Sequence, residues 1–314
     1  MTDKIAIVGA GLIGRAWAIV FARAGRQVAL YDPDPSVLPA ARETIGANLG
    51  DLAESGLIAD PAETIQRIEL VKDLEAALRG ALYVQENGPE NLAIKQALFR
   101  ELDRLADPGA VLASSSSALR ASLFTADLAG RARCLVAHPV NPPYLVPLVE
   151  LSPASWTSQV TVARTRALME AVGQVPVELR REVPGFLLNR LQGALLGEAF
   201  RLVEQGYCST EDIDKTVKDG LGLRWSFMGP FETIDLNAPA GIADYIRRYG
   251  PAYHEMAQSA GTAEKWSDAL TARLEAERRA VLPAERLGER AGWRDRRLMA
   301  LLVHKRKAAK KIGG

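Results

Sequence analysis

The first half of the chain alternates short apolar runs with longer amphipathic stretches, a pattern typical of alternating strands and helices. The run from Lys4 to Val8 leads directly into glycines, as a buried parallel strand does, and residues 12–24 have the periodicity of a helix. A further helix is expected at 91–106. Similar apolar runs predict further strands at residues 27–31, 68–71, 81–85, 110–113, 133–137 and 147–151. Repeated strand–helix–strand units favour an α/β fold with a doubly wound parallel sheet.

Two stretches depart from this rhythm. Residues 36–67 are too long for an ordinary connection and too amphipathic for a loop, so we expect two helices inserted beside the sheet. At Pro184-Gly185 the pattern changes again: residues 186–205 have the apolar spacing of a long helix, and helical periodicity continues after it. The sequence therefore predicts two domains, residues 1–183 with the sheet and residues 184–314 with helices only.

Composition places the chain among ordinary globular proteins. Its 314 residues are 48% hydrophobic and 25% charged, and a net charge of +1 gives no global field that favours nucleic acid or a membrane surface. The two cysteines, Cys134 and Cys208, form neither a disulfide framework nor a metal-ligand spacing, which fits a reducing compartment. We find no signal-peptide pattern and no apolar run near the roughly 18 residues of a membrane span. A soluble, cytoplasmic protein without a bound metal is expected.

A glycine-rich loop follows the first predicted strand. Gly9-Ala-Gly11-Leu-Ile-Gly14 is a G-x-G-x-x-G motif that opens a helix, and Asp32 ends the next strand 18 residues after Gly14. In this setting the motif indicates a Rossmann-type dinucleotide site, with the pyrophosphate at the helix N-terminus. The acid would accept hydrogen bonds from a ribose diol and repel a 2′-phosphate, so NAD is favoured over NADP. The residues expected to bind the cofactor here are Gly9, Gly11, Leu12, Ile13, Gly14 and Asp32.

Polar residues that can carry chemistry follow the later strands. Four serines, Ser114 to Ser117, come directly after the fifth predicted strand, at the edge where parallel sheets bind ligands. His138 follows the sixth strand, and Glu150 lies 12 residues further on, in the seventh. A histidine beside a carboxylate can act as a general base, because one ring nitrogen takes a proton while the acid orients the other. Taken alone, these features also fit a structural histidine and a serine-rich loop.

Together, these motifs resemble the 3-hydroxyacyl-CoA dehydrogenase family in order and spacing. The resemblance extends from residue 4 to about residue 240 and includes Pro184-Gly-Phe-x-x-Asn-Arg190 and Leu221-Gly…Met228-Gly-Pro-Phe-Glu232. Within the family, the serine segment, Ala137-His-Pro-Val-Asn-Pro-Pro-Tyr144 and the run ending at Arg224 are most similar to the lambda-crystallin branch, whose activity is L-gulonate 3-dehydrogenase.

The resemblance implies a hydride-transfer site. His138 would take the hydroxyl proton, Glu150 would orient its ring, and Ser117 and Asn189 would hydrogen-bond the substrate oxygen where negative charge builds. The family positions near the nicotinamide correspond to Glu90 and Lys95. For these two, an exposed, charged helix start is an equally good interpretation.

Charge bears on which substrate is used. A CoA ester carries several phosphates that Lys or Arg must meet. Residues 38–70 hold two arginines, no lysine and six acidic residues, a net charge of −4. A small hydroxy acid needs one well-placed cation instead, and Arg224 offers a planar fork that suits a carboxylate. We therefore expect NAD-dependent oxidation of a short L-3-hydroxy acid, such as L-gulonate, to the 3-keto acid.

Three alternatives stay open. The chain could be a true 3-hydroxyacyl-CoA dehydrogenase acting on 3-hydroxybutyryl-CoA. It could be a carnitine-type dehydrogenase, in which Trp225 and Phe227 would face a trimethylammonium group, or a non-catalytic NAD-binding or structural protein. The family pairs its helical domain across a two-fold axis, so a homodimer through the C-terminal domain is expected, with a small-molecule substrate and no nucleic-acid or membrane partner.

Overall fold

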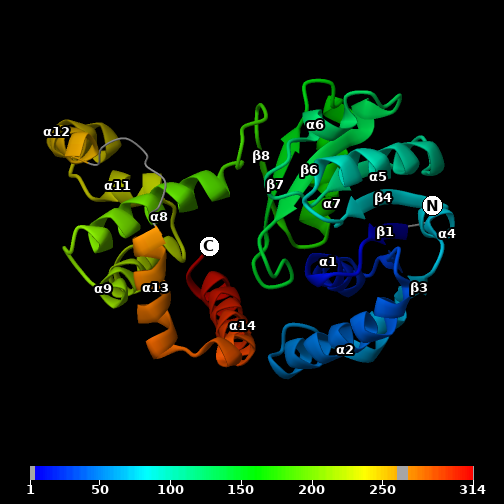
Figure 1. Cartoon of the computed structure of the whole chain (residues 1–314), viewed down its shortest axis with the longest axis horizontal. Helices are drawn as coiled ribbons and strands as arrows, with labels where there is room; N and C mark the ends of the chain where they lie inside the picture. Colours follow the sequence, from blue (N-terminus) through cyan, green and yellow to red (C-terminus); the bar gives the residue numbers. More distant parts are fainter. Residues whose placement is uncertain (1–3, 260–267, 314) are drawn as a thin grey trace. The chain divides into compact units, whose positions relative to one another are not determined.

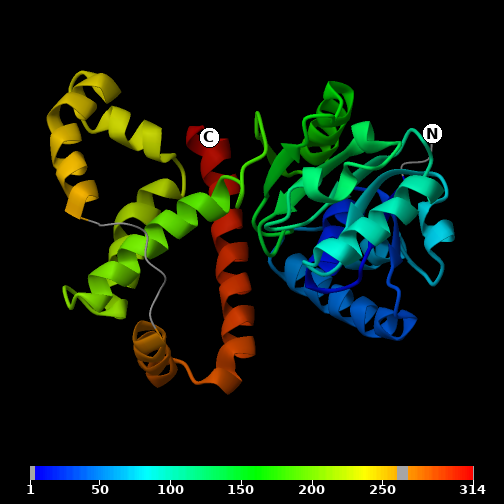
Figure 2. The same cartoon turned by 45° about the horizontal axis from the view of Figure 1, so that its top comes forward.

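The computed structural model describes residues 4–259 and 268–313. Contacts within the chain divide it into two units: Met1–Asn189 with Trp293–Ala308, and Arg190–Gly292 with Ala309–Gly314. The sheet lies in the first unit, and the described part of the second is built of helices (Figures 1 and 2). A segment near the end of the chain thus belongs to the first unit.

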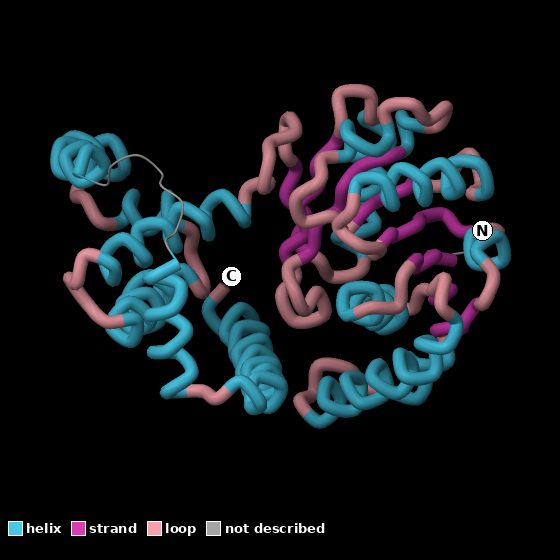
Figure 3. Tube along the Cα trace, viewed as in Figure 1, coloured by secondary structure: helices cyan, strands magenta, loops and turns pink. Residues whose placement is uncertain are grey.

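Eight strands form one sheet in the order β3-β2-β1-β4-β5-β6-β7-β8, drawn in magenta in Figure 3. They are β1 Lys4–Val8, β2 Gln27–Tyr31, β3 Ile68–Val71, β4 Ala81–Glu86, β5 Val111–Ser114, β6 Cys134–Pro139, β7 Leu148–Pro153 and β8 Val175–Glu178. The seven predicted strands are all present, and the predicted doubly wound sheet is confirmed. The sequence did not predict β8, whose four residues include Pro176 and of which none is fully buried.

The sheet differs from the predicted parallel arrangement at β7. This strand runs antiparallel to β6, whereas β1 to β6 are parallel to one another and β8 is parallel to β7. Only residues 140–147 separate β6 from β7, too few for the crossover that two parallel strands need. The antiparallel register places His138 directly opposite Glu150.

Helices cover both faces of the sheet. They are α1 Leu12–Arg23, α2 Leu38–Glu54, α3 Pro61–Gln66, α4 Leu74–Leu78, α5 Leu92–Leu105, α6 Ala121–Thr125 and α7 Gln159–Ala171. Successive side chains of β1 point to opposite faces of the sheet and therefore belong to two different core clusters. Ile5 and Ile7 join a buried cluster with side chains of α1, α2 and α7, while Ala6 and Val8 join one with α4, α5 and α6. Figure 1 shows α1 and α2 on one side of the sheet and α5 on the other. The predicted two-helix insertion is confirmed as α2 and α3.

The last helix, α14 Leu287–Ile312, contributes its middle turns to the first unit. Met299 is 2% exposed and belongs to the cluster that contains α1 and α2, with Leu298 and Leu302 packed against it. The Ser55 hydroxyl donates a hydrogen bond to the Met299 sulfur at 3.2 Å. The last helix therefore carries an apolar stripe that is part of the core of the first unit.

The second unit contains α8 Leu188–Glu204, α9 Thr210–Lys215, a π-helical turn Thr216–Leu221, α10 Gly222–Trp225, α11 Pro230–Leu236, α12 Gly241–Ser259 and α13 Asp268–Val281. The first two residues of α8 belong to the first unit. Thr210 donates to Glu277 at 2.7 Å and Arg273 donates to the Val203 carbonyl at 3.0 Å, which ties α13 to α8 and α9. Among the described residues, no helix is long and apolar enough to cross a membrane.

Candidate active site

The glycine loop between β1 and α1 leaves room for a ligand at one position only. A Cβ on Gly14 would lie 1.8 Å from the Gly9 carbonyl oxygen, and Gly9 itself has φ +98°. A Cβ on Gly11 would meet nothing within 4 Å, and Gly11 caps α1 without a side-chain hydrogen bond. The loop is therefore packed tightly where the backbone turns and open at the helix N-terminus. That geometry fits the pyrophosphate of a dinucleotide.

Asp32 follows β2 and is hydrogen-bonded to the glycine loop. Its carboxylate accepts the Ala10 N–H at 2.7 Å and the Asp34 N–H at 3.0 Å, one on each oxygen. Because each carboxylate oxygen has a further lone pair, Asp32 can still accept hydroxyl groups of a ribose. Leu12 is 60% exposed beside the loop, whereas Ile13 packs against the core cluster.

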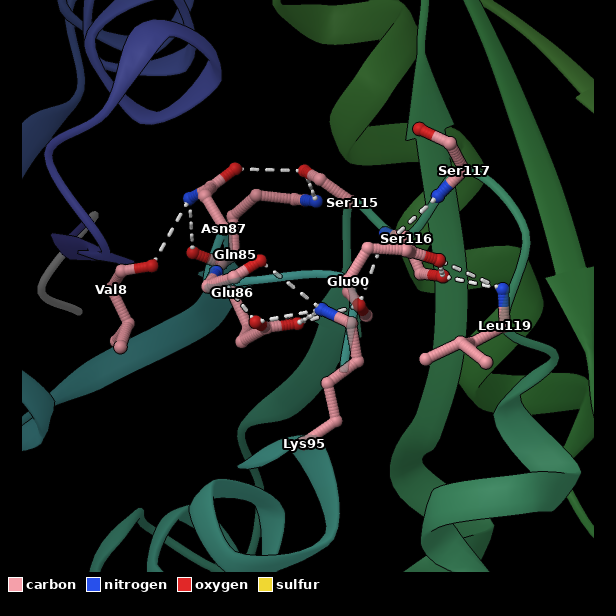
Figure 4. Close-up of polar contacts among 12 residues, drawn as sticks. Val8, Gln85, Glu86, Asn87, Glu90, Lys95, Ser115, Ser116, Ser117 and Leu119 are labelled. Carbon is pink, nitrogen blue, oxygen red and sulfur yellow. Dashed lines mark hydrogen bonds and ion pairs between the residues drawn. The ribbon is translucent and has the colours of Figure 1, made fainter. Parts of the chain in front are cut away.

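Lys95 is enclosed in a buried ion pair rather than exposed. Its ammonium donates to both oxygens of Glu86, at 2.9 and 2.8 Å, and the two side chains are 1% and 0% exposed (Figure 4). Ser114 donates to Glu86 at 2.6 Å and the Gly88 N–H does so at the same distance. The ion pair thus joins the ends of β4 and β5 to α5, so Lys95 supports the site from within the fold.

Glu90 holds the serine segment in shape. Its carboxylate accepts the Ser116 hydroxyl at 2.6 Å and the N–H groups of Ala118 and Leu119 at 3.0 and 2.9 Å, with the Ser117 N–H at 3.4 Å (Figure 4). Burial of this carboxyl group opposes its ionisation. The hydrogen bonds from Ser116, Leu119 and Ala118 outweigh burial, so the pKa of Glu90 lies below its usual value.

Ser115 joins three elements through one oxygen. Its hydroxyl accepts from Trp17 at 3.0 Å and from Gln85 at 2.7 Å, and it donates to Asn87 at 2.8 Å. Gln85 also donates to the carbonyl of Ala137, the residue before His138, at 3.2 Å. The helix after the glycine loop, the serine segment and the strand that carries the histidine are therefore connected by buried polar contacts (Figure 4 shows the part around Ser115).

His138 and Glu150 form a buried pair across β6 and β7. The histidine Nδ1 lies 2.9 Å from Glu150 Oε2, and the side chains are 7% and 2% exposed. The Phe186 ring packs against the imidazole with centroids 5.3 Å apart. Because Nδ1 is engaged, Nε2 is the ring nitrogen left to exchange a proton with a ligand.

The other oxygen of Glu150 faces the start of α8. It accepts the N–H groups of Leu187 and Leu188, at 2.7 and 2.9 Å. The turn before the helix makes this possible, since Gly185 and Phe186 both have positive φ, 76° and 52°. Burial raises the pKa of Glu150, but the hydrogen bonds from His138, Leu188 and Leu187 prevail, and the pKa lies below its usual value.

Ser117 and Asn189 are adjacent in the structure. The Asn189 amide donates to the Ser117 carbonyl at 2.9 Å. The Ser117 side chain is exposed, and its hydroxyl makes no hydrogen bond to another described residue. Since Ser114 and Ser116 are bound to Glu86 and Glu90, Ser117 is the serine of the segment whose hydroxyl is free for a ligand.

Several residues of this site were not identified from the sequence. Glu86 is an acid at the end of an apolar strand, which is the signal that could have revealed it as the partner of Lys95. Phe186 follows Pro184-Gly185, a turn signal that gives no indication of a contact with His138. Arg224 lies exposed on α10 in the second unit, so its predicted role is not tested by the contacts of the first unit.

Comparison with known proteins identifies the family. Residues 4–183 match the NAD binding domain of 3-hydroxyacyl-CoA dehydrogenase, and residues 185–281 match the C-terminal domain of that enzyme. The lambda-crystallin homolog of Bos taurus is 46% identical over 302 residues, 95% of this chain and 94% of that protein. L-carnitine dehydrogenase of Burkholderia mallei is 37% identical over 273 residues, 87% of this chain and 84% of that protein.

A solved structure has the same fold over nearly the whole chain. It is 5-formyl-3-hydroxy-2-methylpyridine 4-carboxylic acid 5-dehydrogenase, an NAD⁺-dependent dismutase. It superimposes with a TM-score of 0.83 at 28% identity and covers 96% of this chain and 97% of that one. The glycine loop and these relatives define an NAD-dependent dehydrogenase that acts on a CH–OH group. The chain belongs to the 3-hydroxyacyl-CoA dehydrogenase family. The predicted family, enzyme class and cofactor are confirmed.

Proposed function

We propose that this enzyme oxidises a short L-3-hydroxy acid of the L-gulonate type to the 3-keto acid, with His138 as the general base. The observation that carries the proposal is the buried His138–Glu150 pair, which engages Nδ1 and leaves Nε2 for the substrate. The ionised acid stabilises the imidazolium that forms when the ring takes a proton.

The reaction needs one proton acceptor and one hydride acceptor. When bound at the glycine loop, NAD⁺ would supply the hydride acceptor for the carbon that carries the hydroxyl group. The hydroxyl proton passes to Nε2 of His138, and the oxygen–hydrogen bonding pair becomes the second bond of the carbonyl group. The imidazolium then returns its proton to solvent, which restores the base.

Ser117 and Asn189 are proposed to hold the reacting oxygen. The free Ser117 hydroxyl and the second N–H of the Asn189 amide are both donors, and donors aimed at an oxygen that gains negative charge lower the barrier. Gly11, Leu12 and the α1 N-terminus would hold the pyrophosphate of NAD, and Asp32 the ribose. Glu90 and Lys95 would act by shaping the loops beside the nicotinamide, since their charged groups are already hydrogen-bonded within the protein.

Charge in the helical insertion supports a free acid over a CoA ester. Its two arginines already have partners: Arg42 donates to the Ile68 carbonyl at 3.0 Å, and Arg67 pairs with Glu63. Residues 38–70 contain six acidic residues and only these two basic ones. Two similar proteins, an L-carnitine dehydrogenase and a pyridine carboxylic acid dehydrogenase, are also named for free acids.

A substrate panel tests the proposal. NADH formation is measured with L-gulonate, L-3-hydroxybutyrate, L-carnitine and L-3-hydroxybutyryl-CoA at matched concentrations. A kcat/KM highest for L-gulonate or L-3-hydroxybutyrate supports it. A preference for the CoA ester assigns the acyl-CoA reaction instead, a preference for carnitine assigns that reaction, and NADH binding without any turnover favours a structural role.

Two substitutions test the residues. His138→Gln lowers kcat by about 10²- to 10⁴-fold, while His304→Gln, at an exposed histidine of α14, leaves it unchanged. Near-normal turnover in His138→Gln contradicts the base assignment. Arg224 is proposed from the sequence to bind the substrate carboxylate. We expect Arg224→Met to raise the KM for free acids and Lys218→Met, the control, to leave it unchanged.

Exposed apolar side chains in the second unit lead us to propose a homodimer through that unit. They include Leu191, Leu223, Phe227, Phe231 and Leu236, each of which is at least 65% exposed. Apolar surface of this extent is usually covered by a partner. Light scattering coupled to size-exclusion chromatography should give twice the 34.0 kDa mass of the chain, and a monomer at micromolar concentration contradicts the proposal.

A further inference from the structure

A cavity of about 610 Å³ opens at the edge of the sheet opposite the catalytic residues. Its walls include Gly25 and Arg67, which precede β2 and β3 respectively. The glycine loop and Asp32, in contrast, follow the carboxyl ends of β1 and β2. Because these strands run in one direction, the cavity and the dinucleotide site lie at opposite edges of the sheet. The volume lies in the range of small-molecule sites.

The cavity is lined by three arginines and two acids. Glu63 is paired with Arg67, so these two charges offset each other. Asp60 uses one oxygen to cap α3, accepting the Glu63 N–H at 2.8 Å. Arg23 and Arg306 are the remaining charged residues of the wall, and among the described residues neither makes an ion pair. The wall therefore has excess positive charge.

The positive charges of Arg23 and Arg306 repel each other. Arg23, at the end of α1, donates one hydrogen bond, to the Tyr144 carbonyl at 2.7 Å. Burial, together with the nearby charge of Arg306, lowers the pKa of Arg23 to about 10. Asp60 and Glu63 do not offset this effect. Arg23 stays protonated near neutral pH, so two cations face one cavity with donors to spare.

We infer that this cavity binds a small organic anion with at least two negative charges, of the phosphate ester or polycarboxylate class, between Arg23 and Arg306. A guanidinium group binds either anion through two parallel N–H donors. The wall also includes the apolar side chains of Leu57, Ile58 and Val172, which suits an anion that carries a carbon skeleton. This site is separate from the one that performs the proposed oxidation.

Occupancy would fasten the last helix to the first unit. Arg23 lies on α1, and Arg306 lies on the part of α14 that belongs to the same unit. An anion held by both arginines bridges these helices and removes their mutual repulsion. A ligand that binds the folded protein alone raises its stability in proportion to the logarithm of ligand concentration. The anion should therefore raise the melting temperature.

The test is a titration of the NAD⁺-saturated protein with citrate or with inorganic phosphate, followed by calorimetry at constant ionic strength. Saturation with NAD⁺ keeps the anion out of the pyrophosphate site. Arg306→Met removes one guanidinium from an exposed position, so folding is retained. Its matched control is Arg297→Met, an exposed arginine nine residues earlier on α14, about 13 Å away along the helix.

We expect one site in the wild-type protein, binding at least 10-fold weaker in Arg306→Met and unchanged in Arg297→Met. The stronger of the two probes assigns the ligand to the polycarboxylate or to the phosphate class. Thermal unfolding gives the second readout: the anion raises Tm in the wild type and in Arg297→Met but not in Arg306→Met. Equal binding in both variants, or no binding of either anion to the wild type at millimolar concentration, overturns the inference.

Discussion

Replacing Glu150 by glutamine changes the charge of the buried pair with almost no change of shape. In the wild-type protein one carboxylate oxygen accepts two N–H groups from the start of α8, and the other faces Nδ1 of His138. A glutamine has only one oxygen. It must point either to the two backbone donors or to the histidine, and its NH₂ group takes the other place.

The backbone donors decide which orientation is adopted. If the NH₂ group faced Leu187 and Leu188, two buried N–H groups would lose their acceptor, at about 1–3 kcal/mol each. The oxygen therefore points to the helix, and the NH₂ group donates to Nδ1. That fixes the hydrogen of the neutral ring on Nε2, the atom that we propose accepts the substrate proton. A preference of about 2–6 kcal/mol leaves the productive tautomer at roughly one part in 30 to one part in 10⁴.

The expected result is a fall in kcat by the same factor, about 30- to 10⁴-fold, measured from NADH absorbance at saturating substrate and cofactor. NADH affinity should stay unchanged, because Glu150 is not in the glycine loop. Glu178→Gln on the neighbouring strand is the control, since that side chain is partly exposed and pairs with Arg166. A Glu150→Gln protein that keeps kcat within threefold of the wild type refutes the tautomer argument.

The same substitution has a consequence for acid stability. Because the pKa of Glu150 is lowered in the folded protein, its carboxylate contributes stability that is complete above the unfolded value of 4.5. This contribution is lost as pH falls through the lower folded pKa. In urea unfolding, the stability difference between wild type and Glu150→Gln should therefore narrow as the pH falls below 4.5. A constant difference would argue against the lowered pKa.

Three further substitutions or labels address the rest of the first unit. Lys95→Met leaves the Glu86 carboxylate buried without its cation, and urea unfolding should show a loss of about 3–5 kcal/mol; a loss below about 1 kcal/mol contradicts the buried ion pair. Gly14→Ala places a Cβ 1.8 Å from a carbonyl oxygen of the loop. Fluorescence titration should show NADH binding weakened at least 10-fold in this variant. Gly50→Ala, where a Cβ has open space, should bind NADH normally. Burial raises the pKa of the Cys134 thiol to about 12, so a thiol reagent at pH 8 should label Cys208 first and Cys134 only after unfolding; rapid labelling of both refutes this.

Much of the first unit was predictable because its strands are apolar runs bounded by glycine, proline and charge. β1, β2 and β3 lie where the sequence places them, and the ends of β4 to β7 differ by one or two residues. β8 was not predicted because proline and half-exposed positions remove the apolar pattern. The direction of β7 depends on the length of the connection between β6 and β7. The pattern of apolar residues predicts where a strand lies but not the direction in which it runs.

The residues of the candidate site could be proposed from motifs, and their roles stay proposals; the contacts between them were less predictable. The motifs identified His138 and Glu150, and the sheet register brings them together. The sequence did not show that Glu86, although an acid at the end of an apolar strand, would pair with Lys95, because an ion pair between a strand end and a helix depends on tertiary packing. Nor did it indicate that the first turn of α8 would donate two N–H groups to Glu150, which depends on positive φ at Phe186.

The place of α14 in the core has a consequence for how the protein is made. Met299 occupies a position beside α1 and α2 that no earlier residue of the chain fills. During synthesis the last strand of the sheet, which ends at Glu178, emerges about 120 residues before this side chain. The nascent first unit therefore carries an open apolar seam until the ribosome has released α14, and a nascent chain stalled within the second unit would expose that seam to chaperones and proteases.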